Sequence, residues 1–333
     1  AAYSAPEAYY TPVIWKYSNI EVLKGAAQIV TGPQSTGGAL NFVTPIGDEK
    51  SDVQFSLSAG AFEQIRGAIS GEVLRTKHTQ LLFGLFHHEA AGFHTIKDQQ
   101  SGGFDLNDGY LKLIHHLDDQ DIHHLEILIA GTTERSQQTY LGTTLSTALL
   151  SPNERYFTSS NDAMSMDRLM TRLGYTMNLK NGFMRADIYR QYVHRNWYKL
   201  DKIDAGNGAV SIASIMEQHL DYPDEFAAAL GQNSDSAFAL LKANNRFYLS
   251  QGAQIRGQWA QRFGNILLKH EAGLRFHYDH ADRFQHTDNY LISQSVFTIT
   301  QPGAPGAAGN RIDYTTAQSA YPRSTVSINK LNI

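Results

Sequence analysis

Long stretches of this chain alternate apolar and polar residues with a period of two, and that pattern limits the possible folds more than any other feature. The clearest run is residues 265–280, where even positions such as Leu274 and Phe276 are mostly apolar. The odd positions of this run carry charges, including Glu271 and Arg275. Because successive side chains of a β-strand point to opposite faces, the run predicts a strand with one apolar and one charged face. It is also longer than the roughly 5–6 residues of an ordinary globular strand.

The same alternation recurs along the chain and predicts ten strands. They are residues 52–60, 64–74, 79–88, 108–117, 122–135, 166–179, 183–197, 247–263, 265–281 and, with a weaker pattern, 323–333. Short and long connections alternate between them. The short ones are residues 118–121, 180–182 and 263–265, and the long ones are residues 89–106, 136–165, 200–245 and 282–314. Tight turns on one side and long loops on the other are typical of a transmembrane β-barrel.

We therefore predict an all-β fold, a transmembrane antiparallel β-barrel of which this chain supplies about ten strands. A soluble β-sandwich is the alternative, because its strands alternate in the same way. Residues 209–243 show partial helical spacing, which predicts short helices inside a surface loop. We expect no separate domain there, because so short a segment cannot bury a core of its own.

Charge, cysteine content and motifs exclude several classes of function. The chain has 28 basic and 32 acidic residues and a formal net charge of −4, so we expect no nucleic-acid partner. The absence of cysteine excludes disulfides, thiol catalysis and cysteine-bound metal sites. No run approaches the ~18 apolar residues of a transmembrane helix. The nucleophile-elbow, zinc-protease and phosphate-loop motifs are also absent from the sequence, so we expect no enzyme activity.

One segment, residues 20–44, carries a motif and reads IEVLKGAAQIVTGPQSTGGALNFVT. It resembles the closing part of the plug domain in TonB-dependent outer-membrane receptors of the ferric-citrate and siderophore type. The plug-motif positions are Glu21, Lys24, Gly25, Gly32, Pro33, Gly37, Gly38 and Asn41. The resemblance implies that residues 1–50 are the C-terminal part of a plug domain. Residues 51–333 would then be the N-terminal portion of a transmembrane barrel with long extracellular loops.

The resemblance also implies a function. The parent protein would lie in the outer membrane of a Gram-negative bacterium, surrounded by lipid, and would bind and import an iron chelate, ferric citrate or another siderophore. Iron would travel as the chelate, with no cofactor held by the protein itself. TonB and its inner-membrane energising proteins would act through a segment before residue 1. A passive porin or an adhesin-like barrel is the alternative, as is a receptor of the same family for haem, cobalamin or an oligosaccharide.

The length suggests that the chain is a fragment of such a receptor. Plugged outer-membrane transporters have about 22 strands, more than twice the number predicted here. The final residues, 327–333, also differ from the aromatic-terminated strand that closes a finished barrel. We therefore expect the end of a plug followed by roughly the first half of a barrel.

Within the plug motif, glycine and proline set the turns, and charged residues are the candidates for contact with the barrel. Gly32 and Pro33 predict a turn, and Gly37 with Gly38 allows positive φ or a close backbone approach. In the family, plug charges pair with charges of the barrel wall, which is the role implied for Glu21 and Lys24. The alternative for each is an exposed cross-strand pair.

Basic residues on the polar face of the strands are the candidates for binding an anionic ligand. They are Arg168, Arg172, Arg185, Arg256 and Arg275. Arginine presents a planar set of donors that fits carboxylates and phosphates. Gln34, on the plug turn, is a further candidate. The alternative is that these arginines pair with Asp187, Glu271 and Asp279 across a wet interior.

Histidine is the remaining candidate for metal chemistry. The chain has 14 histidines, six of them in the doublets His87–His88, His115–His116 and His123–His124. Neighbours in a strand point to opposite faces, so the two members of a doublet cannot share a metal ion. We predict no metal site and a polar role at the wet rim beside residues 118–121. A metal site at that rim is the alternative.

Overall fold

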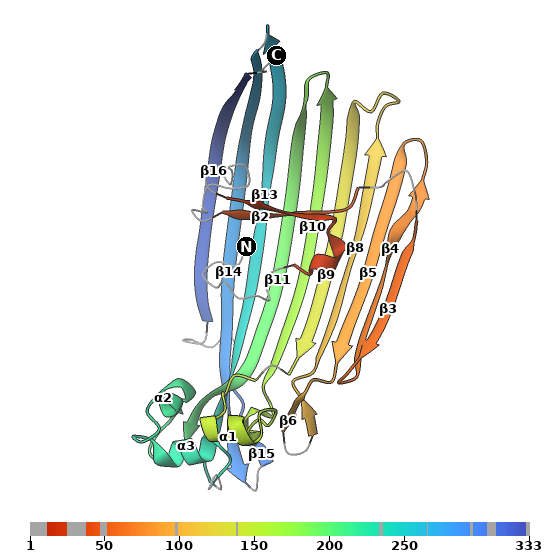
Figure 1. Ribbon diagram of the computed structural model, residues 1–333. Helices are drawn as coiled ribbons and strands as arrows, with labels where there is room; N and C mark the ends of the chain where they lie inside the picture. The colour runs from red at the N-terminus through yellow and green to blue at the C-terminus, as the bar shows by residue number, and fades with distance from the viewer. Residues whose placement is uncertain are drawn as a thin grey trace.

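The dominant feature of the computed structural model is one large antiparallel sheet that curves into part of a barrel wall (Figure 1). The structure describes residues 12–24, 38–46, 52–96, 99–137, 139–232, 236–264, 266–293, 296–304 and 311–330. Ten long strands build the wall in these residues. They are β3 (Gln54–Gly60), β4 (Gln64–Arg75), β5 (Thr79–Ala90), β8 (Phe104–His116), β9 (His123–Ser136), β10 (Ala163–Leu179), β11 (Gly182–Asp204), β13 (Phe238–Phe263), β14 (Ile266–Ser293) and β16 (Arg311–Lys330).

Each long strand pairs with its neighbour in the sequence, and the sheet is open. The shorter strands β12 (Val210–Ser211) and β15 (Val296–Gln301) pair with β11 and β14. In the part of the chain that the structure describes, β3 pairs only with β4, at the opposite edge from β15 and β16. The ten predicted strands all correspond to strands of this sheet. The prediction of an antiparallel barrel wall is therefore confirmed.

The strands extend further than the sequence pattern predicts. β13 begins at Phe238 and β14 continues to Ser293, and the two remain paired from Phe238–Leu291 to Phe263–Ile266. A strand of 28 residues rises roughly 65 Å at a tilt of about 45°, whereas the lipid-facing band is only about 25 Å tall. Beyond that band neither face meets hydrocarbon, so the alternation fades while backbone pairing continues.

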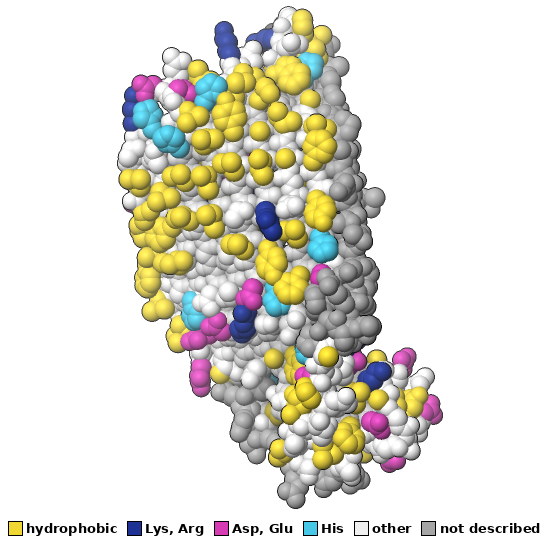
Figure 2. Space-filling model, turned by 180° about the vertical axis from the view of Figure 1, so that it is seen from behind, with side chains coloured by type: hydrophobic (Ala, Val, Ile, Leu, Met, Phe, Trp, Pro, Cys, Tyr) yellow, Lys and Arg dark blue, Asp and Glu magenta, His cyan; other side chains and the backbone are white. Residues whose placement is uncertain are grey.

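The two faces of the sheet differ as the alternation predicts. The convex face carries apolar side chains over most of its height (Figure 2). Leu85, Ile188 and Phe276 are 59%, 62% and 57% exposed there. The concave face buries charged groups such as Asp187 and Lys112. A soluble sandwich would stack the apolar faces on each other, so this arrangement favours a wall that faces lipid.

Short turns and long connections gather at opposite ends of the wall (Figure 1). The turns after β4, β8, β10 and β13 lie at one end, and the helices lie at the other. One connection on the long-loop side is an exception, because β3 and β4 are joined by residues 61–63 alone. Phe62 and Glu63 accommodate this tight turn with φ of 60° and 57°. The end that carries the short turns faces the periplasm in barrels of this kind.

The long connections pack into a small cap with a hydrophobic core. It contains the hairpin β6 (His94–Ile96) and β7 (Gln99–Ser101), the helices α1 (Leu145–Leu150), α2 (Ile212–Glu217) and α3 (Pro223–Ala229), and the 3₁₀ turn η4 (Phe157–Ser159). Side chains of the cap such as Ile215 pack with Leu200 and Leu241 from the ends of the strands. The short helices expected within residues 209–243 are confirmed. Among the described residues, none of the helices has both the length and the apolar character needed to cross a membrane.

Residues 12–24 and 38–46, which the sequence resemblance assigns to a plug and which we call the plug unit, form a separate small unit on the concave side of the wall (Figure 1). It consists of a 3₁₀ turn, η2 (Ile14–Lys16), and two antiparallel strands, β1 (Asn19–Leu23) and β2 (Ala39–Val43). Gly38 precedes β2 with φ of +142°, and a Cβ there would lie 2.7 Å from the carbonyl oxygen of Leu23. Glycine is therefore required at this position of the motif.

The carboxylate of Asp162 ties the cap to the barrel wall. Its two oxygens accept the backbone N–H groups of Tyr140 and Leu200 at 2.9 and 2.8 Å. Burial, the largest effect, raises the pKa of this carboxyl to about 6, although both hydrogen bonds and the Lys199 charge oppose the change. The neutral carboxyl is therefore the form that the folded cap favours.

Replacement of Ile188 by arginine is expected to destabilise the barrel by about 2–4 kcal/mol, because the charge would lie among lipid chains. Arginine in place of Gln191, which lies on the concave face of the same strand, is expected to change stability by only about 0.5 kcal/mol. Denaturant unfolding of the protein in lipid vesicles, followed by fluorescence, measures both. Equal losses would contradict the assignment of the convex face to lipid.

The raised pKa of Asp162 predicts a pH-dependent cap. The stabilising contribution of the neutral carboxyl is complete below pH 3.8 and is lost as the pH rises through about 6. We expect the amides of Tyr140 and Leu200, after correction for intrinsic rates, to exchange hydrogen faster at about pH 7.5 than at about pH 5. Asp162→Asn should remove this difference. A variant that keeps the wild-type pH dependence would show that another group is responsible.

Candidate functional site

A buried ion pair holds the plug segment against the barrel wall. The ammonium group of Lys16 donates to Oδ2 of Asp108 at 2.7 Å, and the two side chains are 4% and 0% exposed. Trp15 Nε1 donates to the other carboxylate oxygen at 3.2 Å, and the hydroxyl of Thr132 donates to Oδ2 at 2.6 Å. Asp108 is thus bonded both to the plug and to β9. A buried charge with several donors is held in one geometry.

Aromatic rings surround the ion pair and exclude water from it. The Trp15 ring stacks on Phe86 with 5.2 Å between centroids and lies tilted 6.2 Å from Tyr110. Gly84 provides the space, because a Cβ there would lie 2.7 Å from the Trp15 ring. Burial lowers the pKa of the Lys16 ammonium group, and the Asp108 charge opposes that effect.

A second contact holds the other end of the plug unit. Lys112 Nζ donates to the Thr44 hydroxyl at 3.1 Å and to the Pro45 carbonyl at 2.9 Å, and it lies 3.4 Å from a carboxylate oxygen of Glu126. Asp108 and Lys112 are both inward-facing residues of β8. The same strand therefore holds the chain before β1 and the chain after β2.

The predicted arginines meet carboxylates on the concave face. Glu126 accepts hydrogen bonds from Arg172 and, at 3.3 Å, from Arg185. Arg185 also lies 2.8 Å from Asp187, which accepts a bond from Gln254 at 3.2 Å. Arg185 thus pairs with Asp187, as the pairing alternative proposed, whereas Glu126, which brings Arg172 and Arg185 together, was not among the predicted partners. Whether any of them binds ligand stays a prediction.

The other predicted arginines also lie on the concave face. Arg168 is buried there, Arg256 lies 5.8 Å from the Phe183 ring, and Arg275 donates to the Tyr189 hydroxyl at 2.9 Å. Asp279, expected to pair with an arginine, instead lies 2.8 Å from the imidazole of His277. The polar face is therefore linked by hydroxyl and imidazole groups as well as by arginines.

Only part of the plug motif can be placed. Asn41 and Glu21 are cross-strand partners, and the Asn41 amide donates to the Glu21 carboxylate at 2.7 Å on an exposed face. Lys24 follows the end of β1. The remaining plug candidates lie outside the described residues, namely Gly25, Gly32, Pro33, Gln34 and Gly37. The boundary between a plug at residues 1–50 and a barrel at 51–333 stays a prediction.

Several contacts in this site were not predicted from the sequence. Lys16 and Asp108 are 92 positions apart, and Lys16 lies in a segment without periodic pattern. Near the long-loop end, the ammonium group of Lys199 lies 3.0 Å from the centre of the Tyr140 ring and 4.5 Å from that of Trp197. Asp108 and Lys112 could have been found, because both fall on the polar phase of the strand that contains them.

Comparisons with known proteins agree with this architecture. No family model matches the chain. A segment of 53 residues is 42% identical to the ferric-pyoverdine M114 receptor PbuA of Pseudomonas sp. (strain M114), covering 16% of this chain and 6% of that protein. The likeness to this relative is therefore local.

Solved structures share the fold over nearly the whole chain. The siderophore receptor PiuA of Acinetobacter baumannii has a TM-score of 0.60 at 11% identity, covering 93% of this chain and 44% of that one. FpvA of P. aeruginosa, bound to a heterologous pyoverdine, has a TM-score of 0.61 at 12% identity, covering 94% and 42%. The ferric citrate transporter FecA has a TM-score of 0.58 at 14% identity, covering 93% and 40%. This chain thus spans less than half the length of these three structures.

The shared fold confirms the predicted antiparallel barrel wall. The antiparallel wall of this chain has the fold of part of the siderophore receptors PiuA and FpvA and of the ferric citrate transporter FecA. The structures that share the fold are named as receptors or transporters.

Loss of Lys16 should loosen the plug. Lys16→Met leaves the Asp108 charge buried without its cation, at a cost of about 3–5 kcal/mol, and Asp108→Asn in the same background should recover much of that loss. Protease cleavage of the plug unit in the membrane-embedded protein, measured against denaturant, reports the change. Lys77→Met is the control, because it breaks an exposed pair with Asp119 and should cost about 0–1 kcal/mol. Equal effects of Lys16→Met and Lys77→Met would mean that the buried pair does not hold the plug.

Proposed function

We propose that this structural homologue of the TonB-dependent siderophore receptors is part of an outer-membrane receptor that binds an iron chelate and imports it. The observation that carries the proposal is the plug unit on the polar, concave side of a wall whose convex side is apolar. A pore that is filled from inside needs a plug that can move before a ligand passes. The local identity to a ferric-pyoverdine receptor supports an iron chelate as the ligand.

The contacts of the plug suit a part that is held in place and can still be released. Its attachment to the wall depends on a few polar bonds, those of Lys16 and Lys112 above all. Buried ion pairs are specific in geometry yet add little net stability compared with an apolar contact. A force applied to the plug can therefore break them in turn. We propose that TonB and its inner-membrane partners supply this force, through a segment outside the described residues.

The ligand is proposed to contact charged and aromatic side chains on the concave face. The candidates remain Gln34, Arg168, Arg172, Arg185, Arg256 and Arg275, with ferric citrate or another siderophore as the anionic chelate. Lys199 is added to them, because its cation lies between Tyr140 and Trp197 only five residues before β11 ends at Asp204. Cation and aromatic rings together suit a chelate that is both anionic and flat.

Deletion of the complete receptor should abolish uptake of at least one ferric chelate under iron starvation. Uptake of radioactive iron as ferric pyoverdine and ferric citrate, compared between the deletion strain and the complemented strain, measures this. The uptake should also disappear in a strain without TonB. Unchanged uptake of every ferric chelate after deletion would overturn the proposal, and uptake that persists without TonB would indicate a passive channel.

Lys199→Met should weaken binding of the transported chelate by about 10- to 150-fold, since one charge-assisted contact is typically worth about 1.5–3 kcal/mol. Titration of the purified receptor with ferric pyoverdine, ferric citrate, haem and cobalamin, followed by tryptophan fluorescence, identifies the ligand and measures the change. Lys77→Met is the matched control at the opposite end of the wall and should bind as the wild type does. If the receptor bound only haem or only cobalamin tightly, that compound would be its ligand and the assignment of an iron chelate would be wrong.

A further inference from the structure

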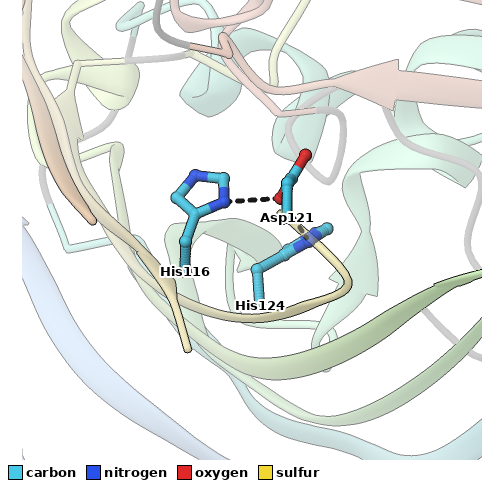
Figure 3. Close-up of side chains that lie close together, drawn as sticks. All are labelled: His116, Asp121 and His124. Atoms are coloured by element: carbon cyan, nitrogen blue, oxygen red, sulfur yellow. Dashed lines mark hydrogen bonds and ion pairs between the residues drawn. The ribbon is translucent and has the colours of Figure 1, made fainter. Parts of the chain in front are cut away.

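Two histidines and an aspartate converge at the short-turn end of the wall (Figure 3). His116 is the last residue of β8, His124 is the second residue of β9, and the two are cross-strand partners. Asp121 lies in the turn between them. The two histidines of one doublet point to opposite faces of the sheet and cannot share a metal ion. The register of β8 and β9, however, brings His116 and His124 to the same face. The sequence alone does not specify this register.

The donor atoms lie at distances that a single metal ion can bridge. Nδ1 of His116 is 2.6 Å from Oδ1 of Asp121, and Nδ1 of His124 is 3.8 Å from the same oxygen. One ligand atom from each of the three residues lies within 4.8 Å of the others. Ligand atoms around a tetrahedral zinc ion are about 3.3 Å apart, so these separations lie on both sides of the required value. Shifts of about 1 Å would complete the site.

The turn holds Asp121 in position. One carboxylate oxygen of Asp118 accepts the N–H groups of Gln120 and Ile122, both at 2.9 Å, and the other accepts the N–H of His123 at 2.7 Å. Asp121 itself has φ of 55°, and its carbonyl accepts a bond from the Asn178 amide at 2.8 Å. The left-handed conformation is uncommon for a residue other than glycine. The backbone of Asp121 is therefore held by contacts that do not depend on the two imidazoles.

The imidazole of His124 has an unused donor or acceptor. Its Nδ1 is buried and makes no hydrogen bond in the part of the chain that the structure describes. The outward members of the doublets are different, since His115 bonds to the Thr79 hydroxyl at 2.9 Å and His123 to the Tyr175 hydroxyl at 2.8 Å. A buried polar atom without a partner is costly unless a ligand satisfies it.

We propose that His116, Asp121 and His124 bind a divalent transition-metal ion such as Zn²⁺ at the short-turn end of the wall. Imidazole nitrogen and carboxylate oxygen are the ligands that zinc accepts, and three protein ligands leave a fourth position for water. The ion replaces the hydrogen bond between His116 and Asp121 and joins the ends of β8 and β9. This site is independent of the chelate that the receptor is proposed to import.

A second cluster, at the other end of the wall, has a weaker geometry. His87 lies 3.5 Å from Glu89 and 3.8 Å from Asp105, but its Nδ1 already bonds to Asn107 at 2.8 Å. It offers a single imidazole among carboxylates that are about half exposed. The donor set at His87 is therefore less suited to a transition-metal ion than the two imidazoles and one carboxylate of His116, Asp121 and His124.

Zinc titration of the complete receptor, purified without a histidine tag and freed of metal, tests the site. We expect the wild type to bind Zn²⁺ and the double variant His116→Ala/His124→Ala to lose at least about 100-fold in affinity at this site. Asp121→Asn should lose less, about tenfold, because asparagine tolerates the left-handed φ but is a weaker ligand. The variant His115→Ala/His123→Ala is the matched control, since it removes two histidines beside the same turn, and its affinity should stay within about twofold.

A spectroscopic measurement separates a lost site from a misfolded variant. Cu²⁺ added in place of zinc should give an electron paramagnetic resonance spectrum with coupling to two imidazole nitrogens. His116→Ala and His124→Ala should each reduce this to one nitrogen, while heat-modifiable migration in gels shows that the barrel is intact. The proposal would be overturned if His116→Ala/His124→Ala left the zinc affinity unchanged. It would also be overturned if the control His115→Ala/His123→Ala lost as much zinc affinity.

Discussion

Hydrocarbon on one side of the wall and water on the other is the constraint from which the rest of the structure follows. A backbone in lipid must satisfy all its hydrogen bonds, so only a paired sheet or a helix can lie there. Apolar side chains such as Leu85 and Ile188 then have to face outward. The exposed pair Arg135–Asp167 lies on the outward phase of its strands, but charged groups that are buried, such as Asp187 and Lys112, lie on the concave side. The plug unit meets that side, which is why polar bonds attach it.

The strands could be predicted because the same constraint leaves a period of two in the sequence. The limits of the strands could not, because β14 continues to Ser293, where neither face meets lipid. The inward phase of Arg172 and Arg185 followed from the alternation. Their partner Glu126 did not, since register decides which charges meet. Register is set by turn geometry and packing that periodicity does not record.

The contacts of Lys16 were beyond sequence reasoning for another reason. Its segment is a single 3₁₀ turn, too short for any periodic signal, and its partner Asp108 belongs to a distant strand. The plug motif could be identified, yet Lys16, Asp108 and Lys112 lie outside residues 20–44, although Lys112 bonds to Thr44 within that segment. A motif shows which unit is present, whereas the pairing of buried charges depends on how two units are placed against each other.

The position of β8 suggests why one strand carries so much of the polar chemistry. Asp108 and Lys112 lie four residues apart on its concave face and hold the plug, and the strand ends at His116 beside the turn. A metal ion bound there would restrain the end of the strand that holds the plug. Rigid supports keep a buried ion pair in its one favourable geometry, and a frayed strand end would weaken it. The proposed zinc site and the residues that hold the plug unit thus lie on the same strand, β8.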